Sequence, residues 1–129
     1  MDPCKTQGAF SWCELMTTDL KAAKKFYGEL FGWEIEDHDM KSMTYSVIKN
    51  GGKATGGMME MPPETSGVPP HWGTYITVKD VDDVAEKALQ MGATSVVSPR
   101  DIPDVGRFFM FKDPQGAMIA IISYHRKSK

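Results

Sequence analysis
The 129-residue sequence contains little cysteine, little histidine and little excess of charge of either sign. Its two cysteines, Cys4 in an expected N-terminal tail and Cys13 in an apolar segment, are too few for a disulfide scaffold, so we expect reduced thiols in the cytoplasm. Fifteen Lys and Arg against 17 Asp and Glu give a formal net charge of -2, which argues against a nucleic-acid partner. No apolar run approaches the roughly 20 residues that cross a bilayer, and no signal peptide is recognisable, so we expect no membrane partner.

The composition that remains is that of an ordinary globular protein, with 41% hydrophobic residues. The length favours a single structural domain that buries its own core. Ten methionines fit either an adaptable binding cavity or irregular core packing.

The first half of the chain alternates between strand and helix patterns. Residues 20–31 carry apolar side chains at helical spacing, with lysines on the opposite face. Asp19 is a typical N-cap residue, Gly32 is a typical C-cap, and Asn50-Gly51 is a hairpin signal. Strands are predicted over Phe10–Met16, Trp33–Glu36, Tyr45–Lys49 and Ala54–Met61.

The second half repeats the same order of patterns. Asp80 begins a helical pattern with apolar residues from Val81 to Met91, and Gly92 ends it. The letters DPQG at residues 113–116 predict a turn. Strands are predicted over Gly73–Val78, Ala93–Val97, Arg107–Lys112 and Ala117–Tyr124.

The two halves are copies of one module, because Asp19 and Asp80 are 61 residues apart and both precede a helix. The sequence therefore predicts an α+β fold of two tandem βαβββ modules, at residues 9–60 and 72–124, in one structural domain. Residues 61–71, which contain four prolines, form an extended linker, and residues 125–129 form a basic tail.

This order of motifs resembles the vicinal oxygen chelate superfamily, also called the glyoxalase/bleomycin-resistance/extradiol-dioxygenase family. The likeness is carried by TDL at 18–20, FY at 26–27 and LFGW at 30–33, and then by VKDV at 78–81, MGA at 91–93 and FKDPQG at 111–116. Each motif alone is common, but their order and duplication cover nearly the whole chain. The resemblance implies curved sheets around a cavity, with the helices on the outer face.

Enzymes of this family usually hold one divalent metal with His, Glu or Gln side chains from the first and last strands of each module. Such a set suits a Lewis-acid site. We align the family's motifs with Asp-Leu and Asp-Pro-Gln-Gly in this sequence. The two first-strand ligand positions then correspond to Trp12 and Gly73, and the two last-strand positions correspond to Ala120 and to a residue near Gly56. None of these side chains ligates a metal, so the resemblance, with this departure, implies no metal site and no cofactor.

Strand alternation places Trp12 and Glu14 on one face of the first strand, and Cys13 and Leu15 on the other face, under a helix. The same alternation turns side chains of the second module toward the expected cavity: Tyr75, Thr77, Met118, Ala120 and Ile122. An apolar lining with aromatic rings is typical of a small-molecule site and suits a flat aromatic ligand.

Glu14 is the candidate catalytic residue, because a carboxylate among aromatic side chains needs a partner or a raised pKa. It either contacts a ligand or acts as a base, or it pairs with Arg107 or Arg100 or reaches solvent. Arg107 is itself either a binding residue for an anionic group or an ordinary edge-strand charge. Tyr45 and Phe109 are further candidates for the cavity or its rim.

His71 follows two prolines and is either a hydrogen-bond donor in the pocket or a loop residue. An alternative site for a divalent metal would combine Glu14, Glu60 and His71, each at an even offset from a carried-over ligand position. Such a site requires converging geometry that spacing alone does not show.

The sequence thus favours a metal-independent protein that binds a small aromatic or drug-like molecule, as the bleomycin-resistance branch of the family does. One alternative is a lyase, isomerase or dioxygenase-like enzyme with a relocated metal or with Glu14 as general base. Another is an accessory subunit that assembles through an apolar sheet edge. By analogy with the family, we expect a homodimer.

Overall fold

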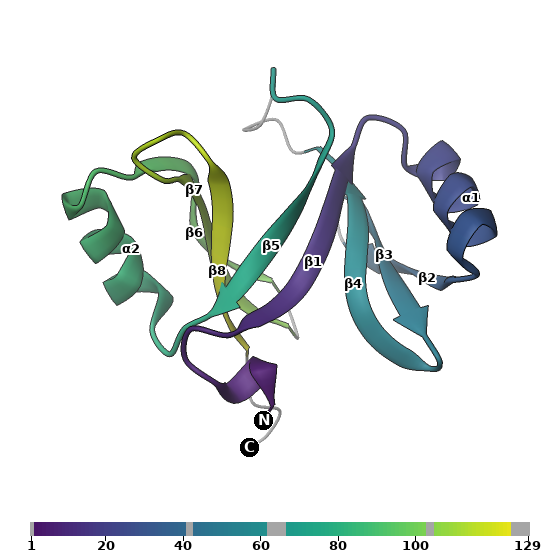
Figure 1. Cartoon of the computed structure of the whole chain (residues 1–129), viewed down its shortest axis with the longest axis horizontal. Coiled ribbons are helices and arrows are strands. Elements are labelled where there is room, and N and C mark those ends of the chain that lie inside the picture. Colours follow the sequence, from purple (N-terminus) through teal and green to yellow (C-terminus); the bar gives the residue numbers. More distant parts are fainter. Residues whose placement is uncertain (1, 41–42, 62–66, 103–104, 125–129) are drawn as a thin grey trace. The chain divides into compact units, whose positions relative to one another are not determined.

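The structure is a computed structural model, and it describes residues 2–40, 43–61, 67–102 and 105–124 (Figure 1). The chain divides into two compact units. One unit is Trp12–Gly73, and the other combines Met1–Ser11 with Thr74–Lys129. Residues 62–66 of the predicted linker and the predicted basic tail (residues 125–129) lie outside the described residues.

The Trp12–Gly73 unit contains the first βαβββ set of elements. They are β1 (Phe10–Thr17), α1 (Leu20–Phe31), β2 (Glu34–Met40), β3 (Met43–Asn50) and β4 (Lys53–Glu60). The strands lie in the order β2-β3-β4-β1, with β1 and β4 parallel and the other pairs antiparallel. Gly51 and Gly52 join β3 to β4 with φ values of 62° and 80°, which glycine adopts at little cost.

The other unit contains the second set, preceded by a short 3₁₀ helix. Its elements are η1 (Pro3–Lys5), β5 (His71–Thr77), α2 (Val81–Gln90), β6 (Thr94–Ile102), β7 (Gly106–Lys112) and β8 (Met118–Tyr124). The strands lie in the order β5-β8-β7-β6, and again only the pair of first and last strands, β5 and β8, is parallel among the pairings described. The predicted α+β fold of two βαβββ modules is therefore confirmed.

The predicted helix boundaries are confirmed by their caps. The Asp19 carboxylate accepts a hydrogen bond from the Ala22 N–H at 3.0 Å, and Asp80 accepts one from Asp83 at 3.1 Å. Gly32 ends α1 in the left-handed region with φ 72°, as its C-cap role requires.

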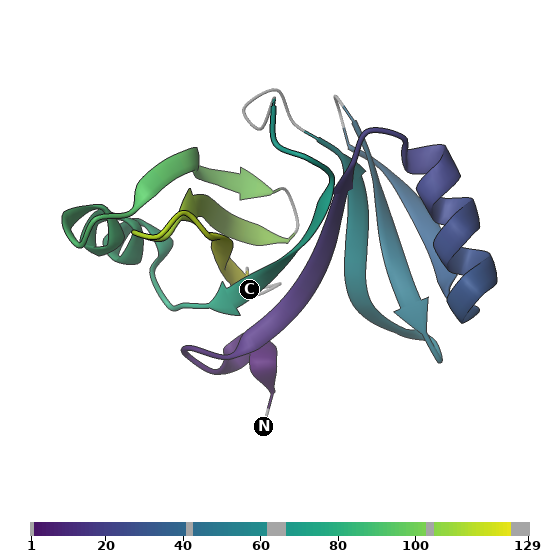
Figure 2. The ribbon, with the colours of Figure 1, turned by 45° about the horizontal axis from the view of Figure 1, so that its top comes forward.

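Helix α1 covers one face of its own sheet (Figure 2). The core under it consists of Leu15, Leu20, Ile48 and Met58, with Tyr27 packed against them. Leu15 is thus under a helix, as strand alternation predicts. Cys13 has the same parity but is exposed, so the prediction that both residues pack under a helix is wrong for Cys13.

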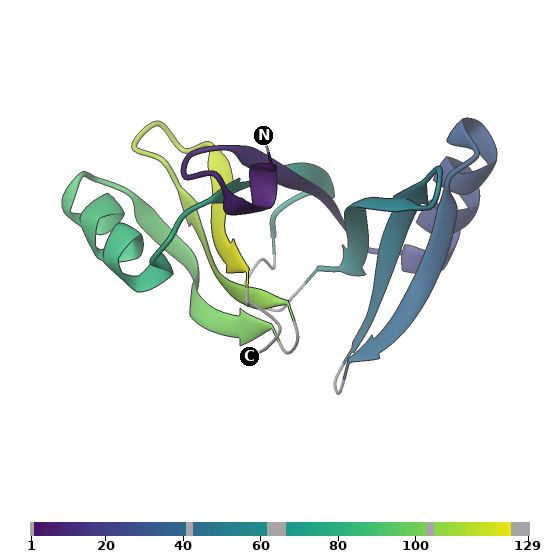
Figure 3. The ribbon, with the colours of Figure 1, turned by 90° about the horizontal axis from the view of Figure 1, so that it is seen from below.

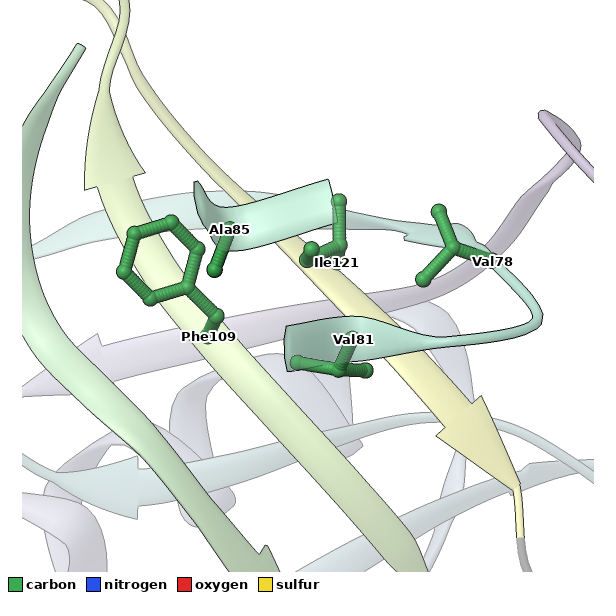
Figure 4. Packing of buried hydrophobic residues seen from close by; sticks show 5 residues of the cluster. All are labelled: Val78, Val81, Ala85, Phe109 and Ile121. Carbon is green, nitrogen blue, oxygen red and sulfur yellow. The ribbon is translucent and has the colours of Figure 1, made fainter. Parts of the chain in front are cut away.

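Helix α2 covers one face of the other sheet (Figure 3). Figure 4 shows the core beneath it, formed by Val78, Val81, Ala85, Phe109 and Ile121. Phe109 is 1% exposed, so it is a core residue. The prediction that Phe109 lines a cavity or its rim is wrong, because odd-numbered residues of β7 face the helix.

The N-terminal residues are bound to the second half of the chain, and Cys4 does not lie in a loose tail. Gly8 donates a backbone hydrogen bond to Thr77, and the Thr77 hydroxyl donates to the carbonyl of Pro3 at 2.7 Å. The Ser11 hydroxyl is hydrogen-bonded to the Tyr124 hydroxyl at 2.7 Å. Burial raises the pKa of Tyr124 to about 12, so this hydroxyl stays protonated at neutral pH.

Candidate functional site
The candidate site lies on the face of the Trp12–Gly73 sheet that α1 does not cover. Leu15 faces α1, so its neighbours in β1, Glu14 and Met16, face the other way, together with Trp12. Tyr45 on β3 and Gly57 on β4 share this face, since Ser46 and Met58 alternate with them and are buried on the helix side. Trp12 and Tyr45 are half-buried, whereas Glu14 is 5% exposed.

Three side chains of this face are linked by hydrogen bonds. The Trp12 Nε1–H donates to the Tyr45 hydroxyl at 2.8 Å. The Tyr45 hydroxyl in turn donates to Glu14 Oε2 at 2.7 Å. The phenol is therefore both acceptor and donor, and it fixes the indole and the carboxylate relative to each other. We call these three residues the Trp12–Tyr45–Glu14 triad.

The triad depends on a glycine in the strand that lies between its members. Tyr45 is on β3 and Glu14 is on β1, and β4 separates the two strands. A Cβ atom on Gly57 would lie 1.9 Å from the Tyr45 hydroxyl oxygen and 2.3 Å from Cζ. The Tyr45 ring therefore crosses β4 in the space that a side chain at position 57 would fill.

A glycine is also required at the neighbouring position 56, because β1 and β4 approach each other closely there. A Cβ atom there would lie 2.5 Å from the carbonyl oxygen of Cys13, which is its partner in the parallel pairing of β1 and β4. Position 56 thus has no room for any side chain, including a metal ligand.

Arg107 does not pair with Glu14, contrary to one of the predicted alternatives. Its guanidinium donates to both carboxylate oxygens of Asp82 at 3.0 and 2.9 Å, and to Asp101 at 3.2 Å. These bonds tie the first turn of α2 to β6 and β7 and hold the pKa of the Asp82 carboxyl below its usual value. Arg107 is thus engaged with carboxylates on the helix side of its sheet, and its role in ligand binding stays a prediction.

His71 is the first residue of β5 and is not a loop residue. Its Nδ1 lies 2.9 Å from the carbonyl oxygen of Pro69, so the ring is held by its own chain segment. Glu60 is likewise used locally, because its Oε2 accepts a hydrogen bond from the Leu20 N–H at the start of α1.

The residues do not fit the divalent metal that the family implies. The carried-over positions present an indole, a methyl group and two glycines, and one of these glycines has no room for a substituent. Among the described residues, no three His, Cys, Asp or Glu side chains lie together in a way that could hold a metal ion. Glu14, Glu60 and His71 are therefore not brought together as the alternative metal site requires.

The corresponding face of the other unit is apolar and closely packed. Tyr75 is 4% exposed and pairs with Ala120, which is 3% exposed. The ring of Tyr75 lies against that of Phe108, with centroids 6.3 Å apart. Met118 is half-buried at the start of β8. Sequence alternation places these residues correctly on one face, and their role in ligand binding stays a prediction.

Sequence reasoning named Glu14, Trp12 and Tyr45 separately but did not find their connection, and it missed Gly57. The available signal was the Gly56-Gly57 pair inside a predicted strand, since glycine in a strand often marks a close approach of another group.

Comparison with known proteins identifies the class. The model of the Glyoxalase/Bleomycin resistance protein/Dioxygenase superfamily matches residues 9–121. The chain therefore belongs to this superfamily, as its motifs suggested. Solved structures share the fold: a methylmalonyl-CoA epimerase from Mycobacterium tuberculosis superposes with a TM-score of 0.68 at 15% identity, covering 95% of this chain and 93% of that one.

Two curated relatives are closer in sequence. A protein of Mycobacterium tuberculosis named putative glyoxylase CFP32 is 40% identical over 123 residues, which are 93% of this chain and 47% of the relative. The anthracycline biosynthesis protein DnrV of Streptomyces peucetius is 31% identical over 115 residues, 89% of this chain and 41% of the relative. The chain spans about half the length, or less, of these relatives. No helix in the described part of the chain has the length and apolar character to cross a membrane.

Proposed function
We propose that this protein binds a flat aromatic molecule without a metal, on the face that carries the Trp12–Tyr45–Glu14 triad. The observation that carries the proposal is the pair of half-buried rings of Trp12 and Tyr45, held in place by the two hydrogen bonds of the triad. Rings fixed in this way bind a planar ligand by stacking at little entropic cost. Glu14 supplies negative charge at the edge of the ring pair.

Metal independence is supported by what occupies the metal-ligand positions. The aromatic ring of Tyr45 lies over Gly57, and Gly56 has no room for a side chain. In this chain, the part of β4 where the family places a metal ligand is therefore covered by the aromatic ring of Tyr45. The affinity then comes from stacking and burial of apolar area, not from chelation of two ligand oxygens.

The relatives support an aromatic ligand. DnrV is named for anthracycline biosynthesis, and an anthracycline carries several fused rings. A planar system of that size could contact both the indole of Trp12 and the phenol of Tyr45, which are joined by a hydrogen bond. We therefore propose a fused-ring aromatic compound as the ligand class.

Titration of the protein with an anthracycline, followed by tryptophan fluorescence and calorimetry, tests this proposal. We expect saturable binding with one site per chain. Trp12→Leu should weaken binding by about fivefold, since a stacking contact contributes on the order of 1 kcal/mol. Trp72→Leu is the matched control, because Trp72 contacts α1 and not the triad, and it should leave the dissociation constant unchanged. Equal effects of both variants, or no saturable binding, would overturn the proposal.

A second candidate function is acid–base catalysis by Glu14. It is favoured by the 5% exposure of this carboxylate and its hydrogen bond from Tyr45, and by the relative named putative glyoxylase. Mass spectrometry of the bound compound after incubation separates the two functions. A binding protein returns the compound unchanged, whereas a catalyst returns a product whose formation stops in Glu14→Gln.

A further inference from the structure
The Trp12–Tyr45–Glu14 triad offers a ligand hydrogen-bond acceptors but no donor. An indole has one N–H, and that of Trp12 is donated to the Tyr45 hydroxyl. A phenol has one O–H, and that of Tyr45 is donated to Glu14 Oε2. Both donors are therefore used within the triad. A ligand that carries only acceptors on its ring edge gains no hydrogen bond from these three side chains.

The charge that the triad presents to a stacked ligand is negative in all of its parts. The faces of the Trp12 and Tyr45 rings carry negative partial charge and attract cations. Glu14 adds the formal charge of its carboxylate. Because this residue is only 5% exposed, water and salt screen its charge weakly. Its field therefore reaches a group that stacks on the neighbouring rings, even where that group does not touch the carboxylate.

These properties separate three kinds of planar ligand. A neutral ring system gains stacking alone. A cationic ring system gains stacking, the attraction of the two ring faces and the attraction of Glu14. An anionic ring system is repelled by the same charges and finds no donor in the triad to offset the repulsion.

We propose that the triad selects planar aromatic cations, and that Glu14 is the residue that determines this preference. The positive charge lies on the ring system that stacks on Trp12 and Tyr45. This inference rests on the binding function proposed above and adds the charge of the ligand to it. It gives Glu14 a role in specificity that involves no proton transfer.

Calorimetric titration with three acridines tests the proposal, because these compounds share one planar ring system. At neutral pH the aminoacridine proflavine is a cation, acridine is uncharged and acridine carboxylate is an anion. We expect proflavine to bind at least about tenfold more tightly than acridine, and acridine carboxylate to bind most weakly. This order should persist at about 0.5 M NaCl, since a nearly buried charge is screened little by salt.

Glu14→Gln tests the assignment to this residue, because an amide oxygen still accepts the hydrogen bond from Tyr45 while the charge is removed. The variant should bind proflavine about tenfold more weakly and acridine within about twofold of the unmodified chain. Glu29→Gln is the matched control, since it changes the net charge equally at a side chain that is 70% exposed on α1. It should leave all three dissociation constants unchanged within about twofold.

The possible results separate this inference from the proposed function. Equal affinities for proflavine and acridine, both weakened by Trp12→Leu, would overturn the charge preference and leave the stacking function in place. A preference for the anion, or a cation preference that Glu14→Gln does not reduce, would also overturn the inference. Binding of none of the three would remove the proposed function and this inference with it. The order of affinities in the unmodified chain stays decisive if Glu14→Gln fails to fold.

Discussion
At the scale of single residues, the candidate site is decided by a glycine and a tyrosine on neighbouring strands. Tyr45 reaches Glu14 only because Gly57 has no side chain, and its hydroxyl satisfies both the Trp12 indole and the Glu14 carboxylate. A carboxylate that is 5% exposed needs such a donor, because an unsatisfied buried acceptor costs about 1–3 kcal/mol.

Gly57→Ala should therefore destabilise the protein by about 1–3 kcal/mol, as expected when a methyl group is forced into a packed region. The new Cβ would lie 1.9 Å from the Tyr45 hydroxyl oxygen, so the ring must move and both hydrogen bonds are lost. Urea unfolding measures the change in free energy, and a change in tryptophan fluorescence accompanies the movement of the Trp12 indole.

Gly73→Ala is the control for that substitution. A Cβ at Gly73 meets nothing within 4 Å, and this glycine is not among those with positive φ. Its free energy of unfolding should stay within about 0.5 kcal/mol of the unmodified chain. Similar losses in both variants would show that the Tyr45 crossing is not what makes Gly57 necessary.

At the scale of elements, α1 has two apolar sides, of which one is buried and the other exposed. One side packs against its own sheet through Leu20 and Tyr27, and the other exposes Phe26 and Leu30. The edge strand β2, in contrast, carries four acidic residues, Glu34, Glu36, Asp37 and Asp39. Assembly through an apolar sheet edge, one of the predicted alternatives, does not fit this strand, because charged edges disfavour strand pairing between molecules.

Asp37 joins three elements and makes their packing pH-dependent. Lys24 on α1 and Ser46 on β3 donate to its carboxylate at 2.8 and 2.7 Å, which lowers the pKa of Asp37 from its usual 3.8. A lowered folded-state pKa contributes stability at pH values above the unfolded-state pKa, and this contribution is lost as pH falls through the folded-state pKa. We expect stability to fall below about pH 4.

In Asp37→Asn the free energy of unfolding should be lower than in the unmodified chain at neutral pH. Below about pH 4 it should depend less on pH. The difference from the unmodified chain should shrink as the solution becomes more acid. Asp39→Asn, two residues along the same strand, is the control, and urea unfolding from neutral to acid pH is the measurement. A constant difference across this range would show that Asp37 acts through something other than its charge.

At the scale of the whole molecule, the same βαβββ plan occurs twice, with different chemistry on the sheet face that each module's own helix does not cover. In the Trp12–Gly73 unit this face carries the polar triad, whereas in the other unit it carries buried apolar residues such as Tyr75 and Ala120. The ligand positions carried over from the family hold an indole, a methyl group and two glycines, none of which binds a metal. The two modules thus share a fold but differ in the chemistry of these faces, since a fold does not by itself determine function.

We expect chelator treatment to leave the protein's melting temperature unchanged. Addition of Zn²⁺, Ni²⁺, Mn²⁺ or Fe²⁺ should also produce no stabilisation, because a ligand stabilises only by binding the folded state. Metal analysis of protein purified without chelator, with thermal unfolding of the same sample, checks both points. One tightly bound metal per chain, removed by Glu14→Ala, would contradict the assignment of the ligand positions.

The sequence by itself determined the element order, the caps at Asp19 and Asp80, the turns and the duplicated plan. These features depend on residues that are close together in the chain. The spacing of apolar residues and the backbone preferences of capping and turn residues are therefore enough to predict them. Strand alternation also placed Leu15 and Glu14 on opposite faces correctly. The family was likewise apparent from the order of the motifs.

Only the tertiary structure decided which distant groups meet. Arg107 pairs with Asp82 and not with Glu14, Phe109 packs under α2, and Tyr45 crosses β4 to reach Glu14. Each of these outcomes depends on which strands are neighbours, in which register, and on which face a helix lies. Contacts between residues 31 positions apart, such as those of Tyr45 and Glu14, exist only after the sheet has formed.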